Sequence, residues 1–114
     1  MAITTLESIR DHWVEAFFNG DYAALAQYED QDFKVIYEQE GRVESHYTRY
    51  TQIEHAVQNG VWKPKKLNVQ AELFDFDENL KQCQVQVELS NQQKIQETWV
   101  YTTEWKITEL RFLK

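Results

Sequence analysis

The sequence is poor in the residues that usually signal special structure, with one cysteine, one proline and three glycines in 114 residues. The single cysteine, Cys83, excludes a disulfide within the chain, so nothing in the sequence requires an oxidising compartment. Each glycine is explained by a turn or by a helix end. No phosphate-binding loop, dinucleotide fingerprint, G-x-S-x-G or paired-cysteine motif is present, and we expect neither a cofactor nor a metal.

Long hydrophobic runs and positive charge are also lacking. No apolar run approaches the length of a transmembrane helix, and the N-terminus lacks the basic-then-apolar pattern of a signal peptide, so the expected location is the cytoplasm. The formal net charge of −7 argues against nucleic acid and anionic membranes as partners. The one basic cluster, Lys63-Pro64-Lys65-Lys66, is typical of a solvated flank of a strand.

Apolar and aromatic residues are plentiful. They make up 42% and 14% of the chain, and the length suits a single domain over residues 1–114. The 16 aromatic side chains (four Trp, six Tyr, six Phe) exceed what the core of so small a domain usually needs. We therefore expect some of them to line a cavity or an interface.

Helical periodicity is confined to the first half of the chain. Apolar residues at helical spacing predict an amphipathic helix over residues 4–18, with a Thr4–Glu7 capping box and an end at Gly20. Asp21 can cap a second short helix over 22–28, followed by a polar loop over 29–32. Strands are expected over 33–38 and 42–47, and a third helix from Thr48 or Thr51 to Asn59-Gly60.

The second half alternates apolar and polar residues, which indicates long antiparallel strands with one covered and one wet face. The expected inward residues are Leu67, Val69, Ala71, Leu73, Cys83, Val85, Val87 and Leu89, and further strands cover 95–101 and 105–113. The apolar phase shifts between Ile107 and Leu110, which predicts a bulge or a strong bend. The pattern favours an α+β cone, in which a strongly bent, mostly antiparallel sheet wraps over three helices.

This order of elements, with Asn19-Gly20-Asp21 between the first two helices, resembles the NTF2-like superfamily, which shares a cystatin-like α+β cone. That superfamily includes nuclear transport factor 2, SnoaL-type polyketide cyclases, scytalone dehydratase and ketosteroid isomerase. The resemblance covers nearly the whole chain and points to an uncharacterised, bacterial-type member. It implies the fold alone, because this fold hosts enzymes, binding modules and oligomerisation domains alike.

The resemblance to ketosteroid isomerase allows a comparison by residue. That family uses a helix tyrosine and a protonated late-strand aspartate as an oxyanion hole, with an aspartate near the end of the first strand as base. Trp13 falls at the tyrosine, Glu97 at the late-strand aspartate, and Tyr37, followed by Glu38, at the base. Trp13 cannot titrate and tyrosine is a poor base near neutral pH, so the ketosteroid reaction is not expected.

Glu97 is the first candidate site residue. It shares a strand face with Ile95, Trp99 and Tyr101, which should point toward the helices. A desolvated carboxyl there would have a raised pKa and could act as a general acid. The alternative is a salt bridge with Arg111 or a solvent-facing position.

Other candidates for a ligand site are aromatic or basic. An aromatic wall for a flat or apolar ligand would consist of Tyr37, Tyr47, Trp99 and Tyr101. Trp13 and Phe17 share the inner face of the first helix, where ordinary core packing is the alternative. Arg49 could clamp a ligand carboxylate or phosphate, or form a surface salt bridge with Glu44 or Glu54.

The three histidines show no shared spacing. His12 and Glu15 lie one helical turn apart, which alone is a weak metal signal. We expect each histidine to be a surface residue, and His46 on the expected second strand is the best placed to assist catalysis.

Three functional hypotheses follow. The leading one is binding of a small, largely apolar or aromatic molecule in the cone. The second is a cofactor-free isomerase, dehydratase or cyclase of the SnoaL type, with Glu97 as acid assisted by Tyr37 or His46. The third is a dimerisation or protein-interaction module with a filled cone, associating through an outer sheet face that carries Gln82, Gln84, Gln86, Gln96 and Thr98.

Overall fold

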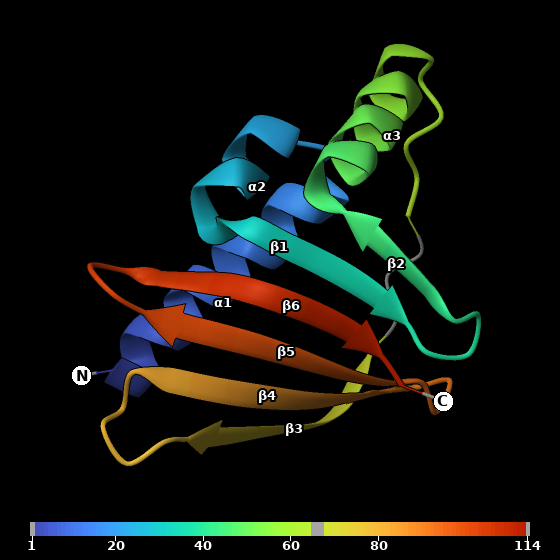
Figure 1. Ribbon diagram of the computed structural model, residues 1–114. Helices are drawn as coiled ribbons and strands as arrows, with labels where there is room; N and C mark the ends of the chain where they lie inside the picture. The colour runs from blue at the N-terminus through green and yellow to red at the C-terminus, as the bar shows by residue number, and fades with distance from the viewer. Residues whose placement is uncertain (1, 65–67, 114) are drawn as a thin grey trace.

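The computed structural model describes residues 2–64 and 68–113, which form three helices and one six-stranded sheet (Figure 1). The elements follow in the order α1 (Ala2–Phe18), α2 (Tyr22–Tyr28), β1 (Glu29–Tyr37), β2 (Arg42–Ser45), α3 (His46–Gln58), β3 (Val69–Phe76), β4 (Gln82–Leu89), β5 (Lys94–Tyr101) and β6 (Trp105–Phe112). The expected α+β class is confirmed. Among the described residues, no helix is long and apolar enough to cross a membrane.

The junction between the first two helices agrees with the sequence pattern. Gly20 adopts the left-handed conformation with φ +70°, and the N–H groups of Gly20 and Asp21 bond to carbonyls of the last turn of α1. The Asp21 side chain then accepts the backbone N–H of Ala24, which caps α2. The capping role predicted for Thr4 lies outside the described side chains.

Two element boundaries were predicted wrongly, and both lie near the candidate site. β1 begins at Glu29, directly after α2, where the sequence indicated a polar loop. α3 begins at His46 rather than at Thr48 or Thr51, because the Ser45 side chain accepts the Thr48 N–H and acts as the N-cap. His46 and the residue after it therefore lie on a helix and not on the second strand.

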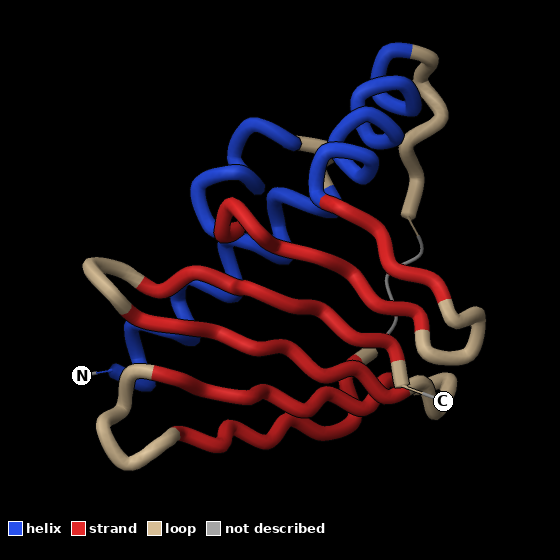
Figure 2. Tube along the Cα trace, viewed as in Figure 1, coloured by secondary structure: helices blue, strands red, loops and turns tan. Residues whose placement is uncertain are grey.

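The sheet has the strand order β2-β1-β6-β5-β4-β3, and α1 lies behind it (Figure 2). Neighbouring strands run antiparallel except for β1 and β6, which are parallel. The predicted bulge is confirmed: Trp99 pairs with Ile107 but Thr98 pairs with Glu109, so Thr108 is the extra residue on β6. The bulge lets Ile107 and Leu110 face the same side of the sheet.

Strand β3 has the opposite phase from the one predicted. A register shift between Val69 and Ala71 turns the following residues over, so that Phe74 pairs with Val85 and faces the helices. Leu73 pairs with Gln86 on the outer face and is 60% exposed. Leu67 lies outside the described residues. The apolar residues change phase from Leu73 to Phe74 and Phe76, which was a usable signal that the prediction did not take into account.

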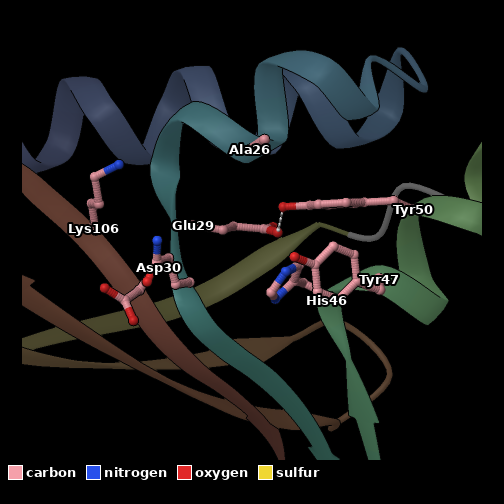
Figure 3. A pocket seen from close by; sticks show the side chains of 8 residues that line it. Ala26, Glu29, Asp30, His46, Tyr47, Tyr50 and Lys106 are labelled. Carbon is pink, nitrogen blue, oxygen red and sulfur yellow. Dashed lines mark hydrogen bonds between the residues drawn. The ribbon is translucent and has the colours of Figure 1, made fainter.

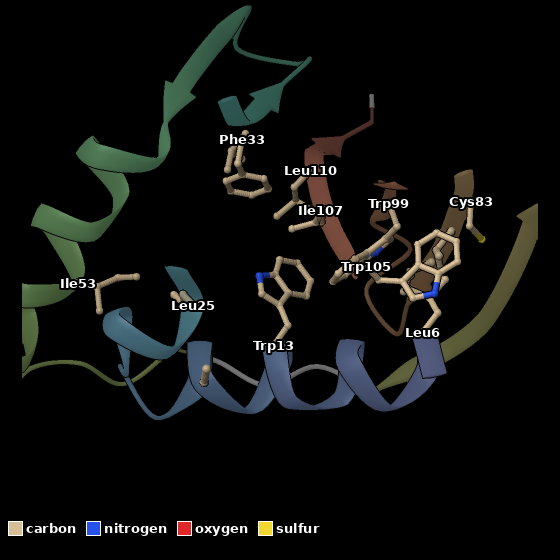
Figure 4. Packing of buried hydrophobic residues seen from close by; sticks show 14 residues of the cluster. Leu6, Trp13, Leu25, Phe33, Ile53, Cys83, Trp99, Trp105, Ile107 and Leu110 are labelled. Carbon is tan, nitrogen blue, oxygen red and sulfur yellow. The ribbon is translucent and has the colours of Figure 1, made fainter. Parts of the chain in front are cut away.

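Tryptophan, phenylalanine and aliphatic side chains fill the space between the helices and the sheet (Figure 4). The largest fully buried side chains are Trp99, Trp105, Phe33, Leu6, Leu25, Ile53 and Ile107. Trp13 projects from α1 toward Phe33, Ile107 and Leu110 in the middle of this core. The centre of the cone is therefore packed, and a site must be sought at its margins.

Candidate functional site

Three of the described glutamates are buried: Glu44 pairs with Arg42, whereas Glu97 and Glu29 each accept three hydrogen bonds from surrounding donors. On β5, Glu97 accepts two bonds from the Arg10 guanidinium: Nε to Oε1 at 2.6 Å and Nη2 to Oε2 at 2.8 Å. The Trp99 indole donates a third bond to Oε1 at 2.8 Å. Arg10 also binds Glu72 of β3 at 3.0 Å, so one arginine of α1 ties two strands together.

The hydrogen bonds described for Glu97 all come from donors, the Arg10 guanidinium and the Trp99 indole. Burial disfavours the Arg10 guanidinium, but the hydrogen bonds and charges of Glu97 and Glu72 outweigh it and raise the pKa of Arg10. The prediction that Glu97 faces the helices is confirmed, at 4% exposure. Its alternative partner was wrong, because Arg111 pairs with Glu38 and Glu109.

The second buried carboxylate belongs to Glu29, the first residue of β1. Its Oε2 accepts the Trp13 indole N–H and an Arg49 Nη1 N–H, each at 2.8 Å. Its Oε1 accepts the Tyr50 hydroxyl at 2.6 Å. The side chain of Glu29 is 0% exposed and that of Arg49 is 9% exposed. Donors from α1 and α3 therefore converge on the point where α2 passes into β1.

This network changes the expected roles of Arg49 and Tyr50. Arg49 is buried and paired with Glu29, so the alternative of a surface bridge to Glu44 or Glu54 was wrong. Burial, followed by the hydrogen bond to the Glu29 carboxylate, raises the pKa of the Tyr50 phenol. Tyr50 thus keeps its proton and donates a hydrogen bond to Glu29, which leaves the lone pairs of the phenol oxygen for other partners.

An open pocket of about 490 Å³ adjoins this second network (Figure 3). It is lined by Ala26 of α2, Glu29, Asp30 and Gln31 of β1, His46, Tyr47 and Tyr50 of α3, and Lys106 of β6. We call it the α2–β1–α3 pocket. Its volume lies within the range of about 300–1,000 Å³ that is usual for small-molecule sites. Its lining is more polar than the apolar cavity expected from the sequence.

The expected aromatic wall is dispersed. Trp99 is fully buried in the core, and Tyr101 packs on Trp105 at the far end of β5. Tyr37 stacks on Phe112 at 5.0 Å, and burial followed by the charge of Glu44 raises the pKa of its phenol.

Trp13 lies in the core and Phe17 packs against it, which agrees with the alternative of ordinary core packing. Of the predicted residues, the pocket contains only His46 and Tyr47, with their ring centroids 4.1 Å apart.

Sequence reasoning missed Arg10, Glu29 and Tyr50. Arg10 had a usable signal, because it lies four residues after Leu6 and three before Trp13, within the apolar stripe of α1. A cation at such a position needs a carboxylate across the interface. Glu29 and Tyr50 gave no comparable signal, since Glu29 begins a strand that was predicted to start later and Tyr50 lies near the start of α3, which was also predicted to start later.

Metal chemistry finds no support in the geometry of the described residues. Over residues 2–64 and 68–113, no group of three or more His, Cys, Asp or Glu side chains could hold a metal ion. His12 and Glu15 are both exposed on α1. Hydrogen bonding, ion pairing and ring contacts are what the α2–β1–α3 pocket offers a bound molecule.

No protein-family model matches the sequence, and no curated protein matches it. Solved structures match over nearly the whole chain. An NTF2-like protein of unknown function in nutrient uptake from Rhodospirillum rubrum has a TM-score of 0.73 at 14% identity, covering 94% of this chain and 95% of its own. An NTF2-like protein from Cytophaga hutchinsonii has a TM-score of 0.70 at 13% identity, with 94% and 93% covered.

A third similar structure is the CaMKII hub of S. rosetta, with a TM-score of 0.72 at 11% identity and coverage of 96% of this chain and 94% of the hub. These identities are too low to transfer an activity. The agreement in topology, element order and coverage settles the architecture predicted from the sequence: the chain has the NTF2-like fold.

Proposed function

We propose that this chain binds a small molecule in the α2–β1–α3 pocket and that the molecule is not covalently transformed there. The observation that carries the proposal is the position of a pocket of about 490 Å³ directly against the hydrogen-bonded network of Glu29. Binding sites combine a concave surface with a few polar groups held in fixed positions. The Glu29 network supplies such groups without needing to move.

The filled interior of the cone favours a binding site at its margin, because the described side chains leave no room for a ligand inside. Trp13, Phe33 and Leu110 occupy the space where a cone-bound ligand would sit. Glu97, the acid of the enzymatic alternative, accepts three bonds and is held by Arg10 at bonding distance. A general acid needs a position within reach of its substrate, and Glu97 is only 4% exposed and bonded to fully buried Trp99.

The pocket is tested by filling it. Ala26 is exposed and lines the pocket, whereas Ala23 is exposed on the same helix without lining it. Native mass spectrometry of the purified protein, followed by a fragment screen monitored by NMR, should reveal ligands that shift the resonances of the pocket residues. Ala26→Phe should abolish those shifts and Ala23→Phe should preserve them. Ligand shifts that survive Ala26→Phe, or no fragment that perturbs the pocket, would overturn the proposal.

A second candidate function is association, and the filled cone favours it. Because the interior is packed, the outer face of the sheet is the surface left for contact with a partner. Gln84, Gln96 and Thr98 are half-buried on this face. One of the similar folds is a hub domain. This candidate predicts a homodimer whose melting temperature falls on dilution, and Thr98→Lys should weaken it. A monomer at every concentration tested by light scattering would exclude it.

A further inference from the structure

We infer that the ligand of the α2–β1–α3 pocket is a small amine that carries a positive charge beside an aromatic or other flat body. This inference rests on the proposed function of that pocket. It depends on three properties of the lining: its uncompensated charge, its rings and the direction of its hydrogen bonds.

The charges of the pocket leave one carboxylate without a cation. Glu29 is compensated by Arg49 at 2.8 Å, and Lys106 lies 3.5 Å from Glu104. The described contacts of Asp30 contain no cation, and its Oδ2 accepts only the backbone N–H of Asp32 at 3.0 Å. The lining is therefore negative by one charge, at the half-buried Asp30. A cation would satisfy it and an anion would be repelled.

Three rings stand at the first turns of α3. The His46 ring centroid lies 4.1 Å from that of Tyr47 and 5.5 Å from that of Tyr50. Tyr47 is 74% exposed although it borders the pocket. An exposed aromatic face within about 6 Å of a cation attracts it electrostatically, and it offers a flat surface to the rest of the molecule. This arrangement is suited to a ligand that is both cationic and flat.

The hydrogen bonds of the wall run in the direction that a donor-bearing ligand needs. The Tyr50 hydroxyl donates its hydrogen bond to Glu29, so its oxygen can only accept from the pocket side (Figure 3). A hydroxyl that donates to a carboxylate is polarised and becomes a better acceptor. Asp30 is an acceptor as well. An ammonium group, with its several N–H donors, fits these acceptors, whereas a carboxylate does not.

Lys106 is the one group of the lining that would oppose a cation. Its Nζ lies 3.4 Å from the Gln27 carbonyl and 3.5 Å from the Glu104 carboxylate, so its charge is directed at these partners. The net charge of −7 also favours the approach of cations to the molecule.

The inference is tested with three compounds of the same shape and different charge: tyramine, p-cresol and 4-hydroxyphenylacetate. Dissociation constants are measured by NMR titration on the full chain at moderate salt. Tyramine should bind at least about tenfold more tightly than p-cresol, and 4-hydroxyphenylacetate should bind most weakly. Equal or tighter binding of the neutral or anionic compound in the pocket would overturn the inference.

Matched variants locate the effect. Asp30→Asn should remove most of the preference for tyramine over p-cresol while leaving p-cresol unchanged, because the amide keeps the shape and loses the charge. Asp32→Asn is the control, since Asp32 is exposed and does not line the pocket. An unchanged preference in Asp30→Asn overturns the inference.

The results distinguish a failure of the ligand's charge assignment from a failure of the pocket itself. If an anion or a neutral compound binds best and Ala26→Phe still abolishes that binding, the charge assignment fails and the pocket stands. If none of the three compounds binds, the charge assignment is overturned for this ligand shape, and the fragment screen on Ala26→Phe decides whether the pocket fails as well.

Discussion

Trp13 and Trp99 meet edge to face, with ring centroids 5.6 Å apart and an interplanar angle of 88°. Their indole N–H groups bond to different buried carboxylates, Trp13 to Glu29 and Trp99 to Glu97. The aromatic pair therefore joins two charged networks inside the fold. Edge-to-face pairs contribute about 0.5–1.5 kcal/mol beyond the area that they bury.

This arrangement explains how an apolar core can enclose charged side chains. Among the described residues, every buried side-chain nitrogen or oxygen has a hydrogen-bond partner. A buried charge that is paired and fully bonded is tolerated, whereas one that loses its partner is costly. The structure thus makes strong predictions about the partners of Glu97 and Glu29.

Replacing Arg10 should destabilise the protein strongly. Arg10→Met leaves Glu97, 4% exposed, without its cation, and we expect a loss of about 3–5 kcal/mol in the free energy of unfolding. Urea denaturation followed by circular dichroism measures the loss. The double variant Arg10→Met, Glu97→Met should recover a large part of it, because a well-packed apolar pair replaces the ions.

Arg111→Met is the control for this experiment. Arg111 is 32% exposed and bridges Glu38 and Glu109 on the outer face, so its loss should cost no more than about 1 kcal/mol. A cost for Arg10→Met as small as that for Arg111→Met would contradict the buried ion pair.

Glu29→Gln should be similarly damaging, because Arg49 would stay buried with a neutral partner. We expect a loss of about 3–5 kcal/mol by the same urea measurement. Glu104→Gln provides the comparison, since Glu104 is 60% exposed and 3.5 Å from Lys106. Its removal should change stability by less than about 1 kcal/mol. Equal effects of the two substitutions would show that Glu29 is hydrated in solution.

The sequence was sufficient for the fold, because apolar periodicity and caps are local signals. Asp21 caps α2 and the phase shift before Leu110 is a bulge, both as predicted. The phase of β3 was predicted wrongly, since one unpaired residue near Val69 inverts the strand, and the adjacent Leu73 and Phe74 were its only trace in the sequence.

The candidate site was much less predictable. Its central contacts join Glu29 to Trp13, Arg49 and Tyr50, and such pairings between distant segments leave no periodic pattern in the chain. The misplacement of α3 added to this, because it left His46 on a strand. Of the missed residues, only Arg10 could have been predicted from the sequence, because it is a cation on an apolar helix face.

Gly20 should tolerate no side chain. It has φ +70°, and an added Cβ would lie 2.6 Å from Val57 Cγ2 and 2.8 Å from Trp62 Cδ1. Gly20→Ala therefore combines about 1–2 kcal/mol for the left-handed backbone with about 1–3 kcal/mol for overpacking. Gly60→Ala is the matched control, because Gly60 has φ +68° with no atom within 4 Å of the added Cβ. Thermal unfolding of both should show the larger decrease for Gly20, and equal decreases would disprove the close contact.

Alkaline pH should weaken the fold through Cys83. Burial raises the pKa of this thiol from its ordinary value of 9.0 to about 11, which means that the folded state disfavours the thiolate. The Cys83 thiol binds its proton more tightly in the folded state than in the unfolded state. Its contribution to the free energy of unfolding is therefore complete below pH 9 and is lost as the pH rises through about 11. The raised pKa values of Tyr37 and Tyr50 act in the same direction at higher pH.

Urea midpoints measured from pH 8 upward should therefore fall, and less steeply in Cys83→Ala, which lacks the thiol but keeps both tyrosines. The same burial predicts that a thiol reagent such as Ellman's reagent reacts slowly with the folded protein at pH 8, because the thiolate is scarce and covered, and rapidly once urea unfolds it. Fast reaction in the absence of urea would mean that the β4 side of the core opens far more readily than its packing indicates.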